Sequence, residues 1–208
     1  MNNNYHFITN WVVKGTVEEV FNIILDAKSL VEWWPSVYLD IKTVNEPDEK
    51  GKNGRFSLLT KGFLPYTLKW DFIPIEIIKN EKIELIAEGD FSGRGIWTFE
   101  QDNDFVKIKY DWKITANKPI LKMLSFLLKP IFSANHNWAM DMGLESLKLE
   151  ILRRRKNSEN ENISPPPPPS KFDTKGLIFI FISILSIIIL LKKLRRKTCK
   201  KSCKKNKK

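Results

Sequence analysis

His136 is the residue whose type and position could best support chemistry. It belongs to a series of positions spaced by three or four residues, which predicts one apolar face of a long helix. The series is Phe132, His136, Met140, Leu144, Leu147 and Ile151. A histidine on such a face can orient a polar group of a ligand or transfer a proton near neutral pH. The alternative is a core histidine bonded to a backbone carbonyl or water, which we favour because proton transfer needs an orienting partner.

A second set of candidates combines one cation with large aromatic side chains. Arg94 lies between two glycines, where its guanidinium could reach a cavity mouth and meet a carboxylate or phosphate, or remain a solvated loop charge. The aromatic side chains could line a pocket for a flat or acyl ligand, although many large aromatics only fill core volume. The expected ligand-binding residues are Trp33, Trp34, Trp70, Arg94, Trp97, Tyr110, Trp112, His136 and Met140.

The sequence lacks the common signatures of catalysis. It has no glycine-rich phosphate loop, no His-Glu metal pattern, no nucleophile elbow and no CxxC pair. We therefore expect no cofactor and no metal, and a binding function is favoured over an enzymatic one.

The distribution of charge argues against a nucleic-acid partner. The formal net charge is +11, but residues 192–208 hold 11 Lys or Arg and no acid, which leaves 24 bases against 24 acids elsewhere. Phosphate binding needs a basic face on the folded part. Both cysteines, Cys199 and Cys203, lie in the basic tail, so the globular part must rely on its core. We favour two unpaired thiols there, with palmitoylation as the alternative.

The elements that must position these residues alternate between strand and helix patterns. Residues 106–114 alternate apolar and charged side chains, which predicts a strand with one dry face, and residues 68–72 and 83–87 repeat the pattern. Gly93-Arg94-Gly95 is expected to form a turn or bulge. The sequence therefore predicts an antiparallel meander.

Helices are expected before and after this meander. Thr16 can cap a helix, with Glu19 completing a capping box, and Asp26–Trp34 predicts a second short helix. Pro119 opens a helical stretch, and Pro130 begins or kinks a longer one that reaches about Arg155. One long helix across a curved antiparallel sheet cannot fill the concave side, so we expect a cavity between them.

This order of elements resembles the α+β helix-grip fold of the START/Bet v 1-like (SRPBCC) superfamily, most closely its bacterial polyketide cyclase/dehydrase branch. The resemblance covers roughly residues 5–154 and implies a curved sheet wrapped around a C-terminal helix that encloses a hydrophobic ligand. It also implies, as an alternative, cyclase or dehydratase activity. It rests on Val17-Glu18-Glu19-Val20-Phe21, Trp33-Trp34-Pro35, Trp97-Thr98-Phe99, Tyr110-Asp111-Trp112, Lys118-Pro119, Asn135-His136-Asn137-Trp138-Ala139-Met140 and Gly143-Leu144.

The rest of the chain lies outside this resemblance. We expect a ligand-binding domain at 1–156, a polar linker at 157–175 containing the run Pro165–Pro169, a membrane-inserted helix at 176–194 and a basic tail at 195–208. The apolar run at 176–191 has 16 uncharged residues. As a helix it spans about 24 Å, less than the ~30 Å hydrocarbon core, so flanking lysines must snorkel.

The membrane topology stays open in the sequence. A tail anchor keeps the domain cytosolic but moves the basic tail across the bilayer, whereas the positive-inside tendency keeps the tail cytoplasmic and exports the domain. A third arrangement places the apolar segment in the plane of the membrane, with the tail on anionic headgroups. We favour a single-pass protein with a cytosolic domain.

Three functional hypotheses follow. The first is membrane-tethered binding or transfer of a lipid or other hydrophobic small molecule. The second is a cyclase or dehydratase that uses His136 for proton transfer. The third is a membrane-anchored scaffold whose proline run recruits a protein with an aromatic groove.

Overall fold

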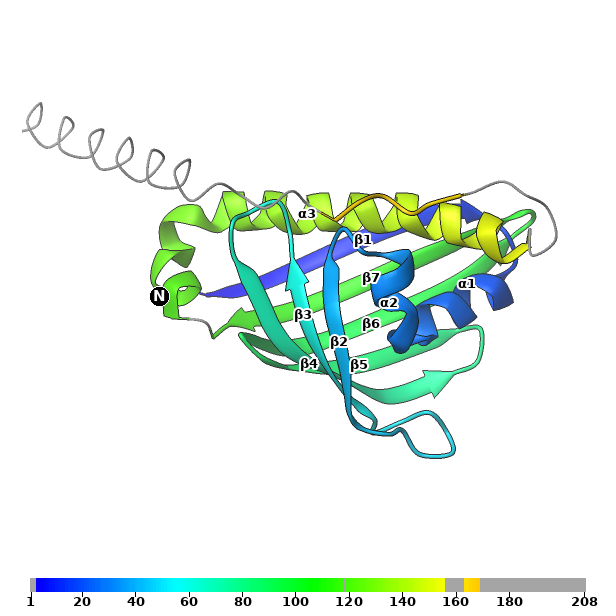
Figure 1. The fold of residues 1–208 in the computed structure, drawn as a ribbon, viewed down its shortest axis with the longest axis horizontal. Helices are drawn as coiled ribbons and strands as arrows, with labels where there is room; N and C mark the ends of the chain where they lie inside the picture. Colours follow the sequence, from blue (N-terminus) through cyan, green and yellow to red (C-terminus); the bar gives the residue numbers. More distant parts are fainter. Residues whose placement is uncertain (1–2, 118, 156–162, 169–208) are drawn as a thin grey trace, which may run out of the picture. The chain divides into compact units, whose positions relative to one another are not determined.

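The computed structural model describes residues 3–117, 119–155 and 163–168. Within these ranges, one curved antiparallel sheet has the strand order β1-β7-β6-β5-β4-β3-β2, and the long helix α3 runs across it (Figure 1). This is the α+β arrangement expected for a helix-grip fold. The elements are β1 (Asn4–Lys14), α1 (Val17–Leu25), η1 (Ala27–Ser29), α2 (Leu30–Trp33), β2 (Tyr38–Asn45), β3 (Arg55–Lys61), β4 (Thr67–Ile78), β5 (Lys82–Gly89), β6 (Phe91–Asp102), β7 (Phe105–Ala116) and α3 (Pro119–Arg155).

The predicted meander is confirmed, and β1 joins it beside β7. Strand β7 alternates as expected: Val106 and Ile108 are buried on the concave side, whereas Lys107 and Lys109 are exposed. All eleven residues of β1 pair with β7, so the first and last strands of the sequence are neighbours. The concave face therefore brings together apolar side chains from strands far apart in the sequence. Most of them form one hydrophobic core with the helices, and Tyr5 and Ala116 form a second, small cluster.

Gly93-Arg94-Gly95 is not a turn, and that prediction was wrong. All three residues lie inside β6 and pair in register with β5 and β7. A Cβ at Gly95 would lie 2.7 Å from Trp112 Cε3 and 2.8 Å from the Tyr110 hydroxyl oxygen. The glycine at 95 therefore makes room for two large rings on the concave face, which explains its position in the middle of a strand.

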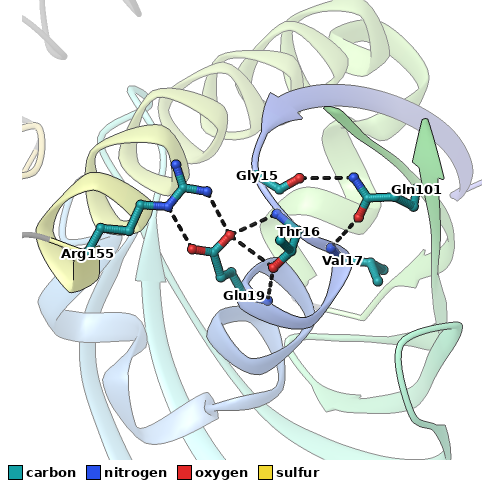
Figure 2. Close-up of polar contacts among 6 residues, drawn as sticks. All are labelled: Gly15, Thr16, Val17, Glu19, Gln101 and Arg155. Carbon is teal, nitrogen blue, oxygen red and sulfur yellow. Dashed lines mark hydrogen bonds and ion pairs between the residues drawn. The ribbon is translucent and has the colours of Figure 1, made fainter. Parts of the chain in front are cut away.

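Helix α1 begins with the predicted capping box. Glu19 N donates to Thr16 Oγ1 at 3.3 Å, and Thr16 N donates to Glu19 Oε2 at 2.8 Å. The carboxylate of Glu19 also accepts two hydrogen bonds from the Arg155 guanidinium, at 2.6 and 2.7 Å (Figure 2). Glu19 therefore joins the start of α1 to the last residue of α3.

Gln101 fixes the same end of the sheet. Its Oε1 accepts from Val17 N at 2.7 Å, and its Nε2 donates to Gly15 O at 3.0 Å (Figure 2). The same Nε2 also donates to Asn103 O and Phe105 O in the β6–β7 turn. One amide thus ties the connection between β1 and α1 to the β6–β7 hairpin, 80 and more residues away.

The helices differ from expectation in two details. The segment Asp26–Trp34 divides into η1 and α2, with Asp26 as the cap. Helix α3 is continuous from Pro119 to Arg155, with Pro130 inside it, and its ribbon changes direction in its first third (Figure 1). A proline lacks the N–H that an interior helical bond requires and so accounts for a bend at this position. The predicted apolar face is confirmed at Met140, Leu147 and Ile151, all buried.

The C-terminal predictions fall largely outside the described residues. The structure does not describe the segment 176–194, the tail 195–208 with Cys199 and Cys203, or most of the linker 157–175. Residues 163–168 have no regular secondary structure, and Ile163, Pro165 and Pro166 are partly buried. No helix among the described residues is long and apolar enough to cross a membrane.

Glu19→Gln should lower the free energy of unfolding by about 1–2 kcal/mol at pH 7, because it weakens the charged bonds to Arg155 and the capping box. The side chains of Glu19 and Arg155 are 32% and 41% exposed, so solvent screening keeps this loss modest. The bonds from Arg155 lower the pKa of Glu19 to about 2 from 4.5. This contribution is therefore complete above pH 4.5 and is lost as the pH falls towards 2.

Glu18→Gln is the matched control, measured by urea denaturation beside Glu19→Gln. Glu18 lies on the same helical turn and forms one exposed ion pair, with Lys79 Nζ at 3.1 Å. Its replacement should change the free energy of unfolding by less than about 0.5 kcal/mol. Equal losses in the two variants would contradict a special role for Glu19.

Candidate ligand-binding site

A cavity of about 190 Å³ lies between α3 and the concave face of the sheet. Its lining is mostly aromatic and aliphatic and comes from β1, the α1–α2 region, the six other strands and α3. The lining includes eight of the predicted binding residues: Trp33, Trp34, Trp70, Trp97, Tyr110, Trp112, His136 and Met140. Residues distant in the sequence thus meet around one space, as the predicted cavity required.

Aromatic rings stack on each other along one wall. Trp97 on β6 and Tyr110 on β7 are register partners, and their ring centroids are 3.9 Å apart at 12°. Tyr110 in turn stacks with Trp112, 5.4 Å away at 22°. Much of the ring surface of Tyr110 is therefore occupied by its neighbours, and the stack forms a rigid wall rather than a set of independent side chains.

His136 lies at the α3 side of the cavity against Phe7 of β1. The two rings stack with centroids 4.0 Å apart at 18°. Burial away from water lowers the pKa of His136 to about 4 from 6.5, so the imidazole is neutral at pH 7. Its Nε2 is buried and has no hydrogen-bond partner among the described residues. A neutral imidazole offers one donor and one acceptor but carries no imidazolium proton to give to a ligand.

Among the phenols that line the cavity, Tyr110 is buried and Tyr38 is partly buried. Burial raises the pKa of Tyr38, and it raises that of Tyr110 well above the usual value, with Tyr38 adding to the effect on Tyr110. Both phenol hydroxyls therefore stay protonated at ordinary pH. The site accordingly holds hydroxyl groups that can donate hydrogen bonds, in a surrounding of low polarity.

Arg94 does not point into the cavity, contrary to expectation. It is on the opposite face of β6, with its side chain 60% exposed, and its Nη2 is 2.5 Å from Glu84 Oε1. Glu84 is only 2% exposed and also lies 2.9 Å from Lys82 Nζ. A buried carboxylate needs paired cations, so Arg94 serves the outer face of the sheet. The strand register places Arg94 outward because Gly95 and Trp97 use the alternating inward positions.

Sequence reasoning missed the role of Asn135. Its Oδ1 accepts a hydrogen bond from Leu64 N in the β3–β4 loop at 3.0 Å, and Asn135 lines the cavity. A Cβ at Gly62 would lie 2.2 Å from that same oxygen, so the glycine allows the loop to approach α3. Trp138 packs edge-on against Phe63 of this loop instead of lining the cavity. No pattern in the sequence pairs a helix asparagine with a loop 71 residues earlier.

The described part of the chain contains no group of three or more His, Cys, Asp or Glu side chains placed to hold a metal ion.

Comparisons with known proteins support the fold only. No family model matches the sequence, and no curated protein matches it. A Thermus thermophilus crystal structure has a TM-score of 0.61 at 16% identity, covering 72% of this chain and 99% of that one. The Zhui aromatase/cyclase from Streptomyces has a TM-score of 0.59 at 10% identity, covering 74% and 97%. A START superfamily protein from Mycobacterium smegmatis has a TM-score of 0.52 at 11% identity, covering 72% and 98%. The chain therefore has the fold of the START/Bet v 1-like proteins.

Burial of a neutral His136 should make stability depend on pH. The unfolded chain binds a proton near pH 6.5 and the folded chain only near pH 4, so the free energy of unfolding falls as the pH drops between these values. The full effect is on the order of 3 kcal/mol. Urea denaturation of the wild type and His136→Leu between pH 7 and 4 should show a weaker decline in the variant. Parallel declines would contradict a depressed His136 pKa.

Proposed function

We propose that this domain binds a hydrophobic small molecule in the cavity between α3 and the sheet. The cavity itself is the observation that carries the proposal, because its lining is apolar and aromatic with a few polar groups at defined places. Filling it would remove apolar ligand surface from water, which is the main source of affinity in such sites. The aromatase/cyclase and START superfamily neighbours share this fold and so are compatible with the proposal.

Catalysis at His136 is the second candidate. The partly buried imidazole lines the cavity, and its buried Nε2 lacks a partner among the described residues, so this nitrogen is available to a bound molecule. Its low pKa keeps it unprotonated, which restricts it to accepting a proton weakly or to hydrogen bonding. This restriction favours a role in binding over general acid catalysis. Cyclase or dehydratase chemistry would need a further proton donor, and the raised pKa of Tyr110 makes that lining phenol a poor one.

Membrane tethering remains a proposal from the sequence of residues 176–194. An anchored domain would be concentrated at a bilayer, where apolar cargo is stored, and the proline run would hold it at a distance. The basic tail would add attraction to anionic headgroups. Binding and tethering together would suit exchange of cargo with a membrane. The scaffold alternative would use the proline run instead, with the cavity empty.

Ala139→Phe should remove bound cargo. Ala139 lines the cavity from α3, and a phenyl ring there would occupy much of a space of about 190 Å³. Solvent extraction and mass spectrometry of the purified full-length protein should yield a near-stoichiometric apolar compound from the wild type and at least about tenfold less from the variant. The matched control is Ala134→Phe, on an exposed position of the same helix, which should retain the cargo.

Wild-type protein that carries nothing, and takes up no apolar molecule offered to it, would contradict the binding function. That result would favour the scaffold alternative. Loss of cargo from both phenylalanine variants would point to general damage to α3 instead of filling of the cavity.

Ile184→Lys should release the full-length protein from membranes. A lysine near the centre of an inserted helix costs about 3 kcal/mol, and the apolar segment is already short. Membrane fractionation with an alkaline carbonate wash should leave the wild type and the control Ile184→Leu in the pellet and move Ile184→Lys to the supernatant. A wild-type protein that is washed off would contradict insertion and favour attachment by the basic tail.

A further inference from the structure

The size of the cavity limits its ligand, provided that the proposed binding function holds. A dry engineered cavity of about 150 Å³ is known to hold one benzene molecule, whereas pockets for drug-sized ligands are about 300–1,000 Å³. The cavity here is about 190 Å³. With its walls as they stand, it has room for one ring or two small fused rings. A whole phospholipid or a long polyketide exceeds this space.

The rigidity of the walls supports this limit. The stack of Trp97, Tyr110 and Trp112 is braced from below, since Gly95 leaves no free space beneath the rings. On the helix side, the Trp34 ring lies against α3 so closely that a Cβ at Gly143 would be 2.2 Å from Trp34 Cζ2. Enlarging the cavity would require these packed rings to leave their places.

The shape and character of the lining favour an aromatic ligand. Large rings surround the space from several sides, among them Trp33 and Trp70 as well as the stacked wall. Aromatic pairs gain attraction in edge-to-face and offset contacts beyond what burial of their area provides. A flexible aliphatic chain of equal size gains free energy only from the burial of its apolar surface, and it loses more conformational freedom on binding.

The electrostatics of the lining favour an uncharged ligand. No Asp or Glu is among the lining residues that the structure describes, and Lys61, at the end of β3, is the one permanently charged lining residue. His136 is neutral at pH 7. An ionised group placed deep in the cavity would be separated from water without a charged partner, which is costly.

Several polar lining groups are donors without an acceptor in the described part of the chain. Among the described residues, no group hydrogen-bonds the side-chain hydroxyl of Tyr38 or Tyr110. The buried indole N–H groups of Trp33 and Trp34 also have no partner within the described part of the chain. Trp70 differs, because its Nε1 donates to Thr60 Oγ1 at 3.1 Å. A buried donor without an acceptor, such as the indole N–H of Trp33 or Trp34, costs free energy, so a ligand acceptor relieves a deficit there. The phenol hydroxyls of Tyr38 and Tyr110 can rotate to donate to the same kind of acceptor.

We propose that the cavity selects a small, uncharged, planar aromatic molecule that carries a carbonyl-type hydrogen-bond acceptor, and that Tyr38 and Tyr110 donate to this acceptor. The two residues are specificity-determining, since the apolar lining alone would accept the corresponding hydrocarbon. Tyr38 comes from β2 and Tyr110 from β7, so the acceptor would be held between opposite parts of the sheet.

Calorimetric titration of the full-length protein with four probes of similar size tests this proposal. Indanone is planar, aromatic and carries a carbonyl; indane lacks the carbonyl; nonanone keeps the carbonyl on a flexible chain; and cinnamate is a planar anion. Indanone should bind about tenfold tighter than indane, the value of one good hydrogen bond, and tighter than nonanone or cinnamate. The full-length protein is kept in detergent, into which the probes can partition. The Ala139→Phe protein in the same buffer therefore serves as the blank.

The double variant Tyr38→Phe, Tyr110→Phe separates specificity from folding. It should bind indane as the wild type does and lose the tenfold preference for indanone. A preference that persists in this variant, or tighter binding of nonanone or cinnamate by the wild type, would overturn the proposed ligand class. If no probe binds above the Ala139→Phe blank, the proposed binding function itself fails, which is a different outcome.

Discussion

The placement of α3 across the concave face is the constraint on which the rest of the structure depends. Arg155 fixes its C-terminal end through Glu19, Trp34 packs against Gly143 in its second half, and Asn135 holds the β3–β4 loop near its middle. Between the last two contacts, His136, Ala139 and Met140 line the cavity. These contacts hold α3 over the concave face of the sheet. The cavity lies beneath the part of the helix between Asn135 and Gly143.

Features determined by nearby residues could be predicted from the sequence. The capping box of Thr16 and Glu19 depends on four consecutive residues, and the alternation in β7 depends on one strand and its two faces. The apolar series on α3 likewise depends on helical periodicity alone. The order of these elements then restricted the fold to a curved sheet with one long helix, and therefore implied that the aromatic side chains meet around a cavity.

Features determined by distant contacts could not be predicted. The glycines around Arg94 suggested a turn, because glycine is common there, whereas Gly95 instead accommodates Tyr110 and Trp112 of the next strand. The inward or outward direction of Arg94 follows from register, which a single sequence does not display. The bond between Asn135 and Leu64 and the stack between His136 and Phe7 depend on packing of elements more than 70 residues apart.

The five tryptophans that line the cavity have an optical consequence. Indole emission depends on the polarity around the ring and on energy transfer to neighbouring chromophores, and Trp33, Trp34, Trp97 and Trp112 are within 6 Å of another aromatic ring. The near-ultraviolet circular dichroism of such coupled rings is sensitive to small changes in their mutual angle. The domain thus contains its own spectroscopic reporter, and the state of its interior can be followed in the purified protein without any added label.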